Sequence, residues 1–305
     1  MTGGEILLRS VGVLVALVLG ATLTWRLEPR VLESAGVTEL GPAAGTHPQG
    51  PIGLAPNPDV WLYPAGPIVA VLGVLFGAVV IPLGPDLVGQ DLGIGVFYFI
   101  VVIDFVVLGL SLGGWGANVR NAAEVYYRAV AQLVSYVVPL GLAYIGAIMM
   151  AGSLSTIAIA QAQEGLWFVV LQPLGFALYL VTGAMQAYRP PFVEPFSRHI
   201  EHGVYGSSAG WQALLWRLSM SGVLLLVAAM GSVLYLGGWN GPLLPDPLWM
   251  ILKTLALMVL MLWLGARFRP LSTAEMLALS WKVLTPVGLA NVLLVGGLIL
   301  LGAGP

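Results

Sequence analysis

Asp104 is the residue whose type and position most clearly point to chemistry. It lies near the middle of a long apolar run, within Val102-Ile103-Asp104-Phe105-Val106. A charged carboxylate at that depth in a membrane is costly, so we expect it to face protein or water rather than lipid. Two interpretations stay open: Asp104 is a proton relay or gating residue, or it is a neutral carboxyl group hydrogen-bonded to a neighbouring helix.

Other polar residues also fall inside apolar runs. Gln132, Ser135 and Tyr136 follow one another at helical spacing. They either form hydrogen bonds across helices, worth about 1 kcal/mol each, or line a hydrated path. Lys253 lies about two turns into a later run, and it either pairs with a buried acid or, the interpretation we favour, extends its flexible side chain to the membrane interface.

The residue patterns give little support for a metal site or for a nucleophilic catalytic site. His199 and His202 are three residues apart, but no H-E-x-x-H pattern is present, so we expect a solvated loop there. The chain has no Cys, which excludes disulfides, thiolate metal sites and iron–sulfur clusters held by this chain. No catalytic triad motif or phosphate-binding glycine loop is recognisable. We therefore expect neither a metal nor a covalently bound cofactor.

These residues must be positioned by membrane helices. The chain is 58% hydrophobic and 9% charged, against about 25% charged in soluble domains. Apolar runs of about 20 residues cross a bilayer as helices. We predict an all-α polytopic membrane protein, an eight-transmembrane-helix bundle in which residues 1–305 form a single transmembrane domain. The predicted spans are 6–25, 63–83, 92–112, 127–151, 166–187, 211–236, 247–266 and 281–302.

The basic residues predict the orientation. Ten of the twelve fall in or beside the first, third, fifth and seventh gaps between these runs, and Lys and Arg accumulate on the cytoplasmic side. The odd-numbered loops are thus expected in the cytoplasm and both termini outside, in a bacterial plasma (inner) membrane. Arg26 and Arg30 follow the first run, which favours a retained helix over a cleaved signal peptide.

Glycine and proline predict two further features. The first loop, about 28–62, is rich in both residues and is expected to be irregular. The pairs Gly73/Gly77 and Gly109/Gly113 have the spacing that lets membrane helices approach closely, and we expect this packing inside one bundle rather than in a dimer.

Several ordered motifs resemble one family along about residues 28–291. The chain resembles the H subunit (mitochondrial subunit 1) of NADH:quinone oxidoreductase, respiratory complex I, and is similar to the equivalent subunit of membrane-bound nickel–iron hydrogenases. The motifs are Glu28, Arg30, Gly41-Pro42, Gly50-Pro51-Ile52-Gly53, Gly114-Trp115, Asn118, Arg120, Arg128, Gln132-Leu133-Val134-Ser135-Tyr136, Ala151-Gly152-Ser153-Leu154, Arg189, Pro191-Phe192, Pro195, Leu236-Gly237-Gly238-Trp239, Gly241-Pro242, Leu252-Lys253, Trp281-Lys282 and Pro286.

The resemblance implies a role in a large assembly. In the family this component joins the membrane arm to the soluble arm, forms much of the quinone chamber and begins a proton route. The implied partners are iron–sulfur-carrying soluble subunits, antiporter-like membrane subunits, lipid and quinone, with no nucleic acid. The implied chamber or soluble-arm contacts are Glu28, Arg30, Arg189 and Phe192. The implied polar intramembrane path consists of Asp104, Gln132, Tyr136 and Lys253.

The chain departs from the family mainly at acidic positions. Where relatives carry acids in their Ser-Tyr-Glu and Pro-Phe-Asp motifs, this chain has Val137 and Val193. Family glutamates in the fifth and sixth helices correspond to Gln186 and Ser219. An aliphatic side chain cannot relay a proton, and Ser or Gln can only support a water chain. We therefore expect a degenerate acidic proton channel.

Three alternatives remain open at this stage. The same fold could anchor a hydrogenase, formate-oxidising or ferredoxin-oxidising module. It could serve as a purely structural component. It could instead be a secondary transporter, although that class is typified by paired intramembrane charges and pseudo-repeats, and no repeat is visible by eye.

Overall fold

The computed structural model describes residues 3–34, 57–85, 87–192, 208 and 210–302, and every regular element within these ranges is helical. The predicted all-α class is therefore confirmed. Each predicted apolar run is helical over most of its length. The elements are α1 (Gly3–Ser34), α2 (Leu62–Ala78), α3 (Gly95–Ile103), α4 (Phe105–Gly116), α5 (Arg120–Ala151), α6 (Thr156–Gln161), α7 (Phe168–Leu171), α8 (Pro173–Gln186), α9 (Trp211–Tyr235), α10 (Asp246–Gly265), α11 (Thr273–Leu279), the π-helical η3 (Ser280–Leu284) and α12 (Thr285–Leu300).

Among the described helices, five segments are long and apolar enough to cross a membrane. They are Gly95–Gly116, Ala122–Ala151, Trp211–Tyr235, Asp246–Gly265 and Thr273–Leu300. Helix α2 is apolar but shorter, with 17 residues. The number of eight crossings and the location of the termini stay predictions.

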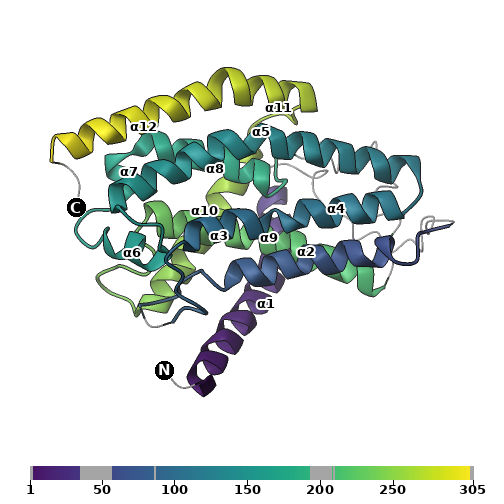
Figure 1. Ribbon diagram of the computed structural model, residues 1–305, viewed down its shortest axis with the longest axis horizontal. Coiled ribbons are helices and arrows are strands. Elements are labelled where there is room, and N and C mark those ends of the chain that lie inside the picture. The colour runs from purple at the N-terminus through teal and green to yellow at the C-terminus, as the bar shows by residue number, and fades with distance from the viewer. Residues whose placement is uncertain (1–2, 35–56, 86, 193–207, 209, 303–305) are drawn as a thin grey trace.

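Helix α9 forms the centre of the bundle. Its apolar window is 89% buried, whereas that of Thr273–Leu300 is only 22% buried. Small residues allow neighbours to approach α9 closely: a Cβ at Gly231 would lie 2.5 Å from the ring of Tyr179. In Figure 1, α12 (yellow) runs along the outer edge of the bundle and α1 (purple) crosses the other helices at a steep angle.

The glycine pairs behave as expected from their spacing. A Cβ at Gly109 of α4 would lie 2.5 Å from the carbonyl oxygen of Gly66 in α2, and one at Gly73 would lie 2.8 Å from Cβ of Phe105. Helices α2 and α4 therefore pack backbone against backbone inside this chain, and the prediction of close intramolecular packing is confirmed.

The first loop begins later than predicted. Helix α1 continues through Pro29 to Ser34, so Glu28 and Arg30 lie on a helix. The expectation of an irregular segment from residue 28 was wrong because these turns have buried partners: Leu32 is 3% exposed, and Glu28 pairs with a distant arginine described below. Residues 35–56 lie outside the described part of the chain.

Two spans are interrupted at polar residues. Asp104 ends α3 and precedes α4, and its carbonyl oxygen accepts hydrogen bonds from the amides of Val107 and Leu108. Gln172 separates α7 from α8, which starts at Pro173. Helices commonly begin at proline because the missing N–H has no partner in the first turn.

Candidate functional site

The segment after α8 turns back into the bundle. The amide of Arg189 donates to the carbonyl of Ala184, and the amide of Phe192 donates to the carbonyl of Arg189. We call residues 187–192 the Arg189 turn. Its carbonyl at Pro190 packs directly on Gly265 of α10, where a Cβ would overlap it. The sequence had placed these residues in a polar cytoplasmic loop, but Tyr188, Arg189 and Phe192 are at most 3% exposed.

Arg189 forms a buried ion pair with Glu28 of α1. Its Nε lies 2.8 Å from Oε1 and its Nη2 lies 3.0 Å from Oε2 of Glu28. Remaining guanidinium donors reach the carbonyls of Met220 and Ala187, at 3.2 and 3.3 Å. Both charged side chains are only 1% exposed. Removing one partner of such a pair leaves an uncompensated buried charge, so the pair locks α1 to the Arg189 turn.

Gln132 of α5 fixes the two ends of the Arg189 turn. Its Nε2 donates to the carbonyl of Met185 at 2.6 Å and to that of Phe192 at 3.1 Å. The side chain is completely buried. A buried amide with two backbone acceptors cannot move without losing both hydrogen bonds, so Gln132 holds the turn in one conformation. Its predicted place on a polar path remains a prediction.

Asp104 lies against two polar side chains of neighbouring helices. The hydroxyl of Tyr136 donates to Oδ1 of Asp104 at 3.0 Å, and Nε2 of Gln186 lies 3.4 Å from the same oxygen. Tyr136 is 1% and Gln186 3% exposed. The acid thus faces protein, as its depth in the apolar run led us to expect. The two hydrogen bonds that Asp104 accepts are compatible with both interpretations, a proton relay or a carboxyl group hydrogen-bonded to its neighbours.

Among the described residues Lys253 forms no ion pair with an acid, and the interpretation we favoured, a side chain that reaches the membrane interface, stays a prediction. Its side chain is buried on α10, and Nζ donates to the carbonyls of Leu236, Gly238 and Asn240. The loop after α9 supplies these acceptors because Gly237 and Gly238 adopt positive φ angles of 70° and 55°, which glycine tolerates best. The lysine is therefore separate from Asp104, Gln132 and Tyr136.

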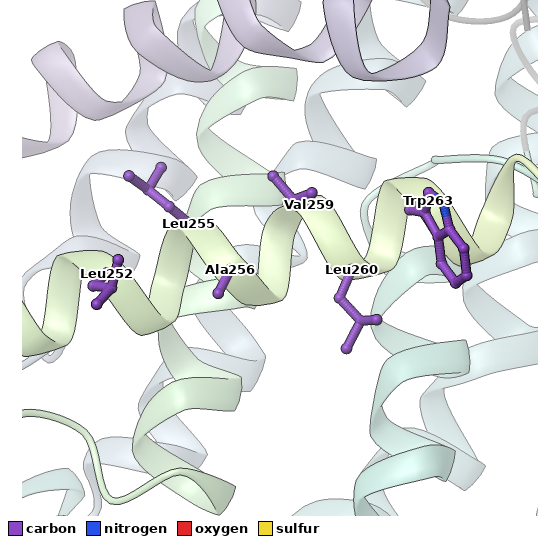
Figure 2. Close-up of a pocket in the computed structure, with 6 residues that line it drawn as sticks. All are labelled: Leu252, Leu255, Ala256, Val259, Leu260 and Trp263. Atoms are coloured by element: carbon purple, nitrogen blue, oxygen red, sulfur yellow. The ribbon is translucent and has the colours of Figure 1, made fainter. Parts of the chain in front are cut away.

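The remaining predicted residues are distributed differently. Arg30 is exposed on α1. Phe192 lines an apolar cavity of about 440 Å³ between α8, the Arg189 turn and the end of α10. A second, open concavity runs along one face of α10 from Leu252 to Trp263 (Figure 2), and its lining offers no charged group for chemistry.

Sequence reasoning missed Gln163 entirely. Its Nε2 donates to the carbonyls of Ile159 and Val233, while its Oε1 accepts from the amides of Phe168 and Gly237. All four side-chain bonds go to backbone groups of three segments, so one amide ties together the loops at the end of the bundle where Lys253 lies. A glutamine at the border of an apolar run was the only available signal.

The two closely spaced histidines, His199 and His202, lie outside the described residues. Within the described ranges, no cluster of three or more His, Cys, Asp or Glu residues could hold a metal ion.

Comparison with known proteins gives a consistent result. The sequence model of the family described as NADH dehydrogenase matches residues 54–296. A Rhodopseudomonas palustris (strain BisB5) protein, named as an H subunit of NADH-quinone oxidoreductase, is 37% identical over 299 residues, covering 93% of each chain. A protein of the same name from Rhodopseudomonas palustris (strain HaA2) is 34% identical, and the match covers 98% of each chain. A Geobacter metallireducens protein of the same name is 33% identical, covering 80% of this chain and 77% of its own.

Proposed function

This chain belongs to the NADH dehydrogenase family, as a homologue of the H subunit of NADH-quinone oxidoreductase, and from that premise we propose how it works within a complex I-like enzyme. It is a membrane protein and one component of a larger assembly. We place it between the soluble electron-transfer arm and the membrane arm, at or near the quinone chamber. The hydrogenase-anchor and transporter alternatives are not favoured, because the relatives are named as components of NADH-quinone oxidoreductase.

The Glu28–Arg189 pair carries this proposal. The resemblance assigned both residues to the chamber or its soluble-arm contacts, and they meet at 2.8 Å although 161 positions separate them. The pair and Gln132 together give the Arg189 turn a fixed backbone. A rigid turn at the end of a helical bundle provides a defined base on which a soluble subunit can be docked and a quinone headgroup positioned.

A quinone has two parts with different requirements. The cavity of about 440 Å³ beside Phe192 is lined mainly by apolar side chains, including Met261 and Phe268, with Arg269 as its one charged residue, and this lining suits an apolar tail. Arg30, exposed on α1, and residues of the cytoplasmic loops would then contact the soluble arm or the headgroup. No metal or covalent cofactor is needed in this chain for that role.

The acidic path through this chain is degenerate. Gln186, which corresponds to a family glutamate, lies beside Asp104, so an amide now stands where the family would place a second carboxyl group. Ser219, at another family acid, is fully buried and donates to the carbonyl of Trp216 within its own helix. Because amide and hydroxyl groups do not titrate in the physiological range, Asp104 has few titratable neighbours for proton relay.

We assign the chain to the bacterial plasma membrane as a single transmembrane domain of eight spans. The odd-numbered loops face the cytoplasm, where Arg and Lys predominate. In this orientation the Arg189 turn lies at the cytoplasmic end of the bundle and Lys253 near the outer end. The antiporter-like partners would pack against lipid-exposed helix faces.

Affinity extraction tests the proposal. The tagged chain is extracted in mild detergent, and everything bound to it is identified by mass spectrometry. Iron–sulfur and antiporter-like subunits are expected in stoichiometric amounts, and Arg189→Ala should release the soluble subunits first. Recovery of the chain alone, or as a simple homo-oligomer, would overturn the assignment. Proton uptake per electron pair in vesicles tests the degenerate path: full stoichiometric pumping that depends on this chain would contradict it.

A further inference from the structure

The ammonium group of Lys253 occupies a closed cage of backbone oxygens. Nζ lies 2.6 Å from the carbonyl oxygen of Leu236, 3.0 Å from that of Gly238 and 2.6 Å from that of Asn240. The rings of Trp167 and Trp249 lie 4.2 and 5.6 Å from it, within the range of cation–π attraction. The lysine is 5% exposed.

The geometry fits the charged form of the side chain. An ammonium group has three N–H donors and no acceptor, and the cage offers three acceptors. A neutral amine would turn its lone pair toward one carbonyl oxygen. Among the described residues no carboxylate forms an ion pair with Lys253, so its positive charge is held by dipoles and ring faces and is not neutralised.

The cage lies at the opposite end of the bundle from the Glu28–Arg189 pair. Arg189 donates to the carbonyl of Met220 in α9, and Lys253 donates to that of Leu236 just beyond the same helix. Sixteen residues of α-helix separate these carbonyls, which corresponds to about 24 Å at 1.5 Å per residue. Lys253 thus lies at the C-terminal end of α9, whereas Arg189 contacts α9 nearer its middle, at Met220.

Three buried tyrosines pack in a row inside the bundle, and the hydroxyls of Tyr179 and Tyr235 donate to the carbonyls of Val227 and Ala143. The ring centroids of Tyr144 and Tyr179 are 5.7 Å apart, and those of Tyr179 and Tyr235 are 5.6 Å apart. Tyr235 directly precedes Leu236, the first acceptor of Lys253. Polar groups inside a membrane protein can support water and proton entry, and a fixed positive charge beside the last residue of α9 opposes the passage of cations at this end of the bundle.

We propose that Lys253 is an electrostatic seal, a caged positive charge that prevents protons and other cations from leaking through this end of the bundle. Gln163 and Asn240 support the seal, since they hold the cage loop through hydrogen bonds to its backbone and to the carbonyl of Ala160. Fixed positive groups exclude cations from membrane pores by the same electrostatic effect.

The test measures proton entry without electron transfer. The purified complex that contains this chain is reconstituted in liposomes, a potassium diffusion potential is imposed, and internal pH is followed with a trapped dye in the absence of any electron donor. Lys253→Gln keeps two N–H donors but removes the charge, and we expect its proton leak per complex to rise about tenfold, whereas Lys253→Arg, which keeps the charge, stays near wild type. Failure of this test leaves the function proposed above untouched.

Two results would overturn the seal. In the first, the proton leak of Lys253→Gln is as low as that of wild type. In the second, Lys253→Arg leaks as much as Lys253→Gln, which would mean that loop geometry matters and charge does not. If Lys253→Gln does not assemble, Trp167→Leu replaces it, because this variant keeps the lysine and removes the nearer ring. The proton leak of Trp167→Leu should rise severalfold, whereas the control Trp167→Phe, which keeps a ring, should stay near wild type. An unchanged leak in Trp167→Leu counts against the proposal.

Discussion

The side-chain amide of Gln186 lies 3.4 Å from Oδ1 of Asp104, the same oxygen that accepts the hydroxyl of Tyr136. Gln186 ends α8, whereas Asp104 sits at the break between α3 and α4. Because the resemblance places a family glutamate at position 186, the contact is an amide–carboxyl pair in place of a pair of acids. The proposed degenerate path can therefore be tested at one position.

Gln186→Glu should restore proton relay at Asp104. Two adjacent carboxyl groups cannot both ionise easily, so they share a proton and can pass it on. We expect more protons taken up per electron pair in vesicles oxidising NADH than with the wild-type chain. Gln186→Leu, which removes the hydrogen bond without adding an acid, is the control and should not raise the ratio. Equal ratios in both variants would exclude position 186 from proton transfer.

Breaking the Glu28–Arg189 pair should be strongly destabilising. Arg189→Met leaves the carboxylate of Glu28 buried without a partner, and losses of this kind cost about 3–5 kcal/mol. Thermal unfolding of the detergent-solubilised complex measures the effect. Combining Arg189→Met with Glu28→Gln should recover part of the loss, since no buried charge then remains. Additive effects of the two substitutions would contradict a direct pair.

The sequence predicted the class of the fold because the apolar runs are long and nearly free of charge. It also predicted that Glu28 and Arg189 share a site, but only through the family resemblance. Their contact joins segments 161 residues apart, and no local pattern carries such information. Intramembrane polarity alone did flag Asp104 and Tyr136, which do meet.

Lys253 shows what local reasoning left out. Its depth in the run suited a side chain that reaches the interface, and the decisive partners are backbone carbonyls of the loop after α9. Those carbonyls point inward because of positive φ at Gly237 and Gly238. Glycine in a sequence permits that conformation but does not require it, so the cage could not be derived from residue types.

Gln132→Leu should loosen the Arg189 turn. The substitution removes the side-chain donor from the carbonyls of Met185 and Phe192. The Met185 carbonyl keeps the amide of Tyr188, and the buried carbonyl of Phe192 loses its side-chain donor, at a cost of about 1–3 kcal/mol for a buried polar group left unsatisfied. We expect lower thermal stability of the complex and weaker retention of the soluble arm on size-exclusion chromatography. Ser135→Ala is the control, because that hydroxyl donates only within its own helix, to Ala131. If the two variants have the same thermal stability and retain the soluble arm equally, Gln132 does not hold the Arg189 turn.

Gly109→Ala should disrupt the contact between α2 and α4. The new methyl group would lie 2.5 Å from the carbonyl oxygen of Gly66 and 2.8 Å from Cβ of Ala70. Both neighbours are backbone or rigidly attached, so the helices must separate, and overpacking of this kind costs about 1–3 kcal/mol. The yield of assembled complex and its unfolding temperature are expected to fall.

Gly141→Ala provides the matched comparison, since a Cβ at Gly141 of α5 would meet nothing within 4 Å. Alanine also favours a helix over glycine by about 1 kcal/mol, so this variant should be neutral or slightly more stable. The difference between the two alanine variants isolates close helix packing from any general effect of replacing glycine. If Gly141→Ala is as damaging as Gly109→Ala, the α2–α4 contact is not what Gly109 provides, and an outside partner at position 141 must be sought instead.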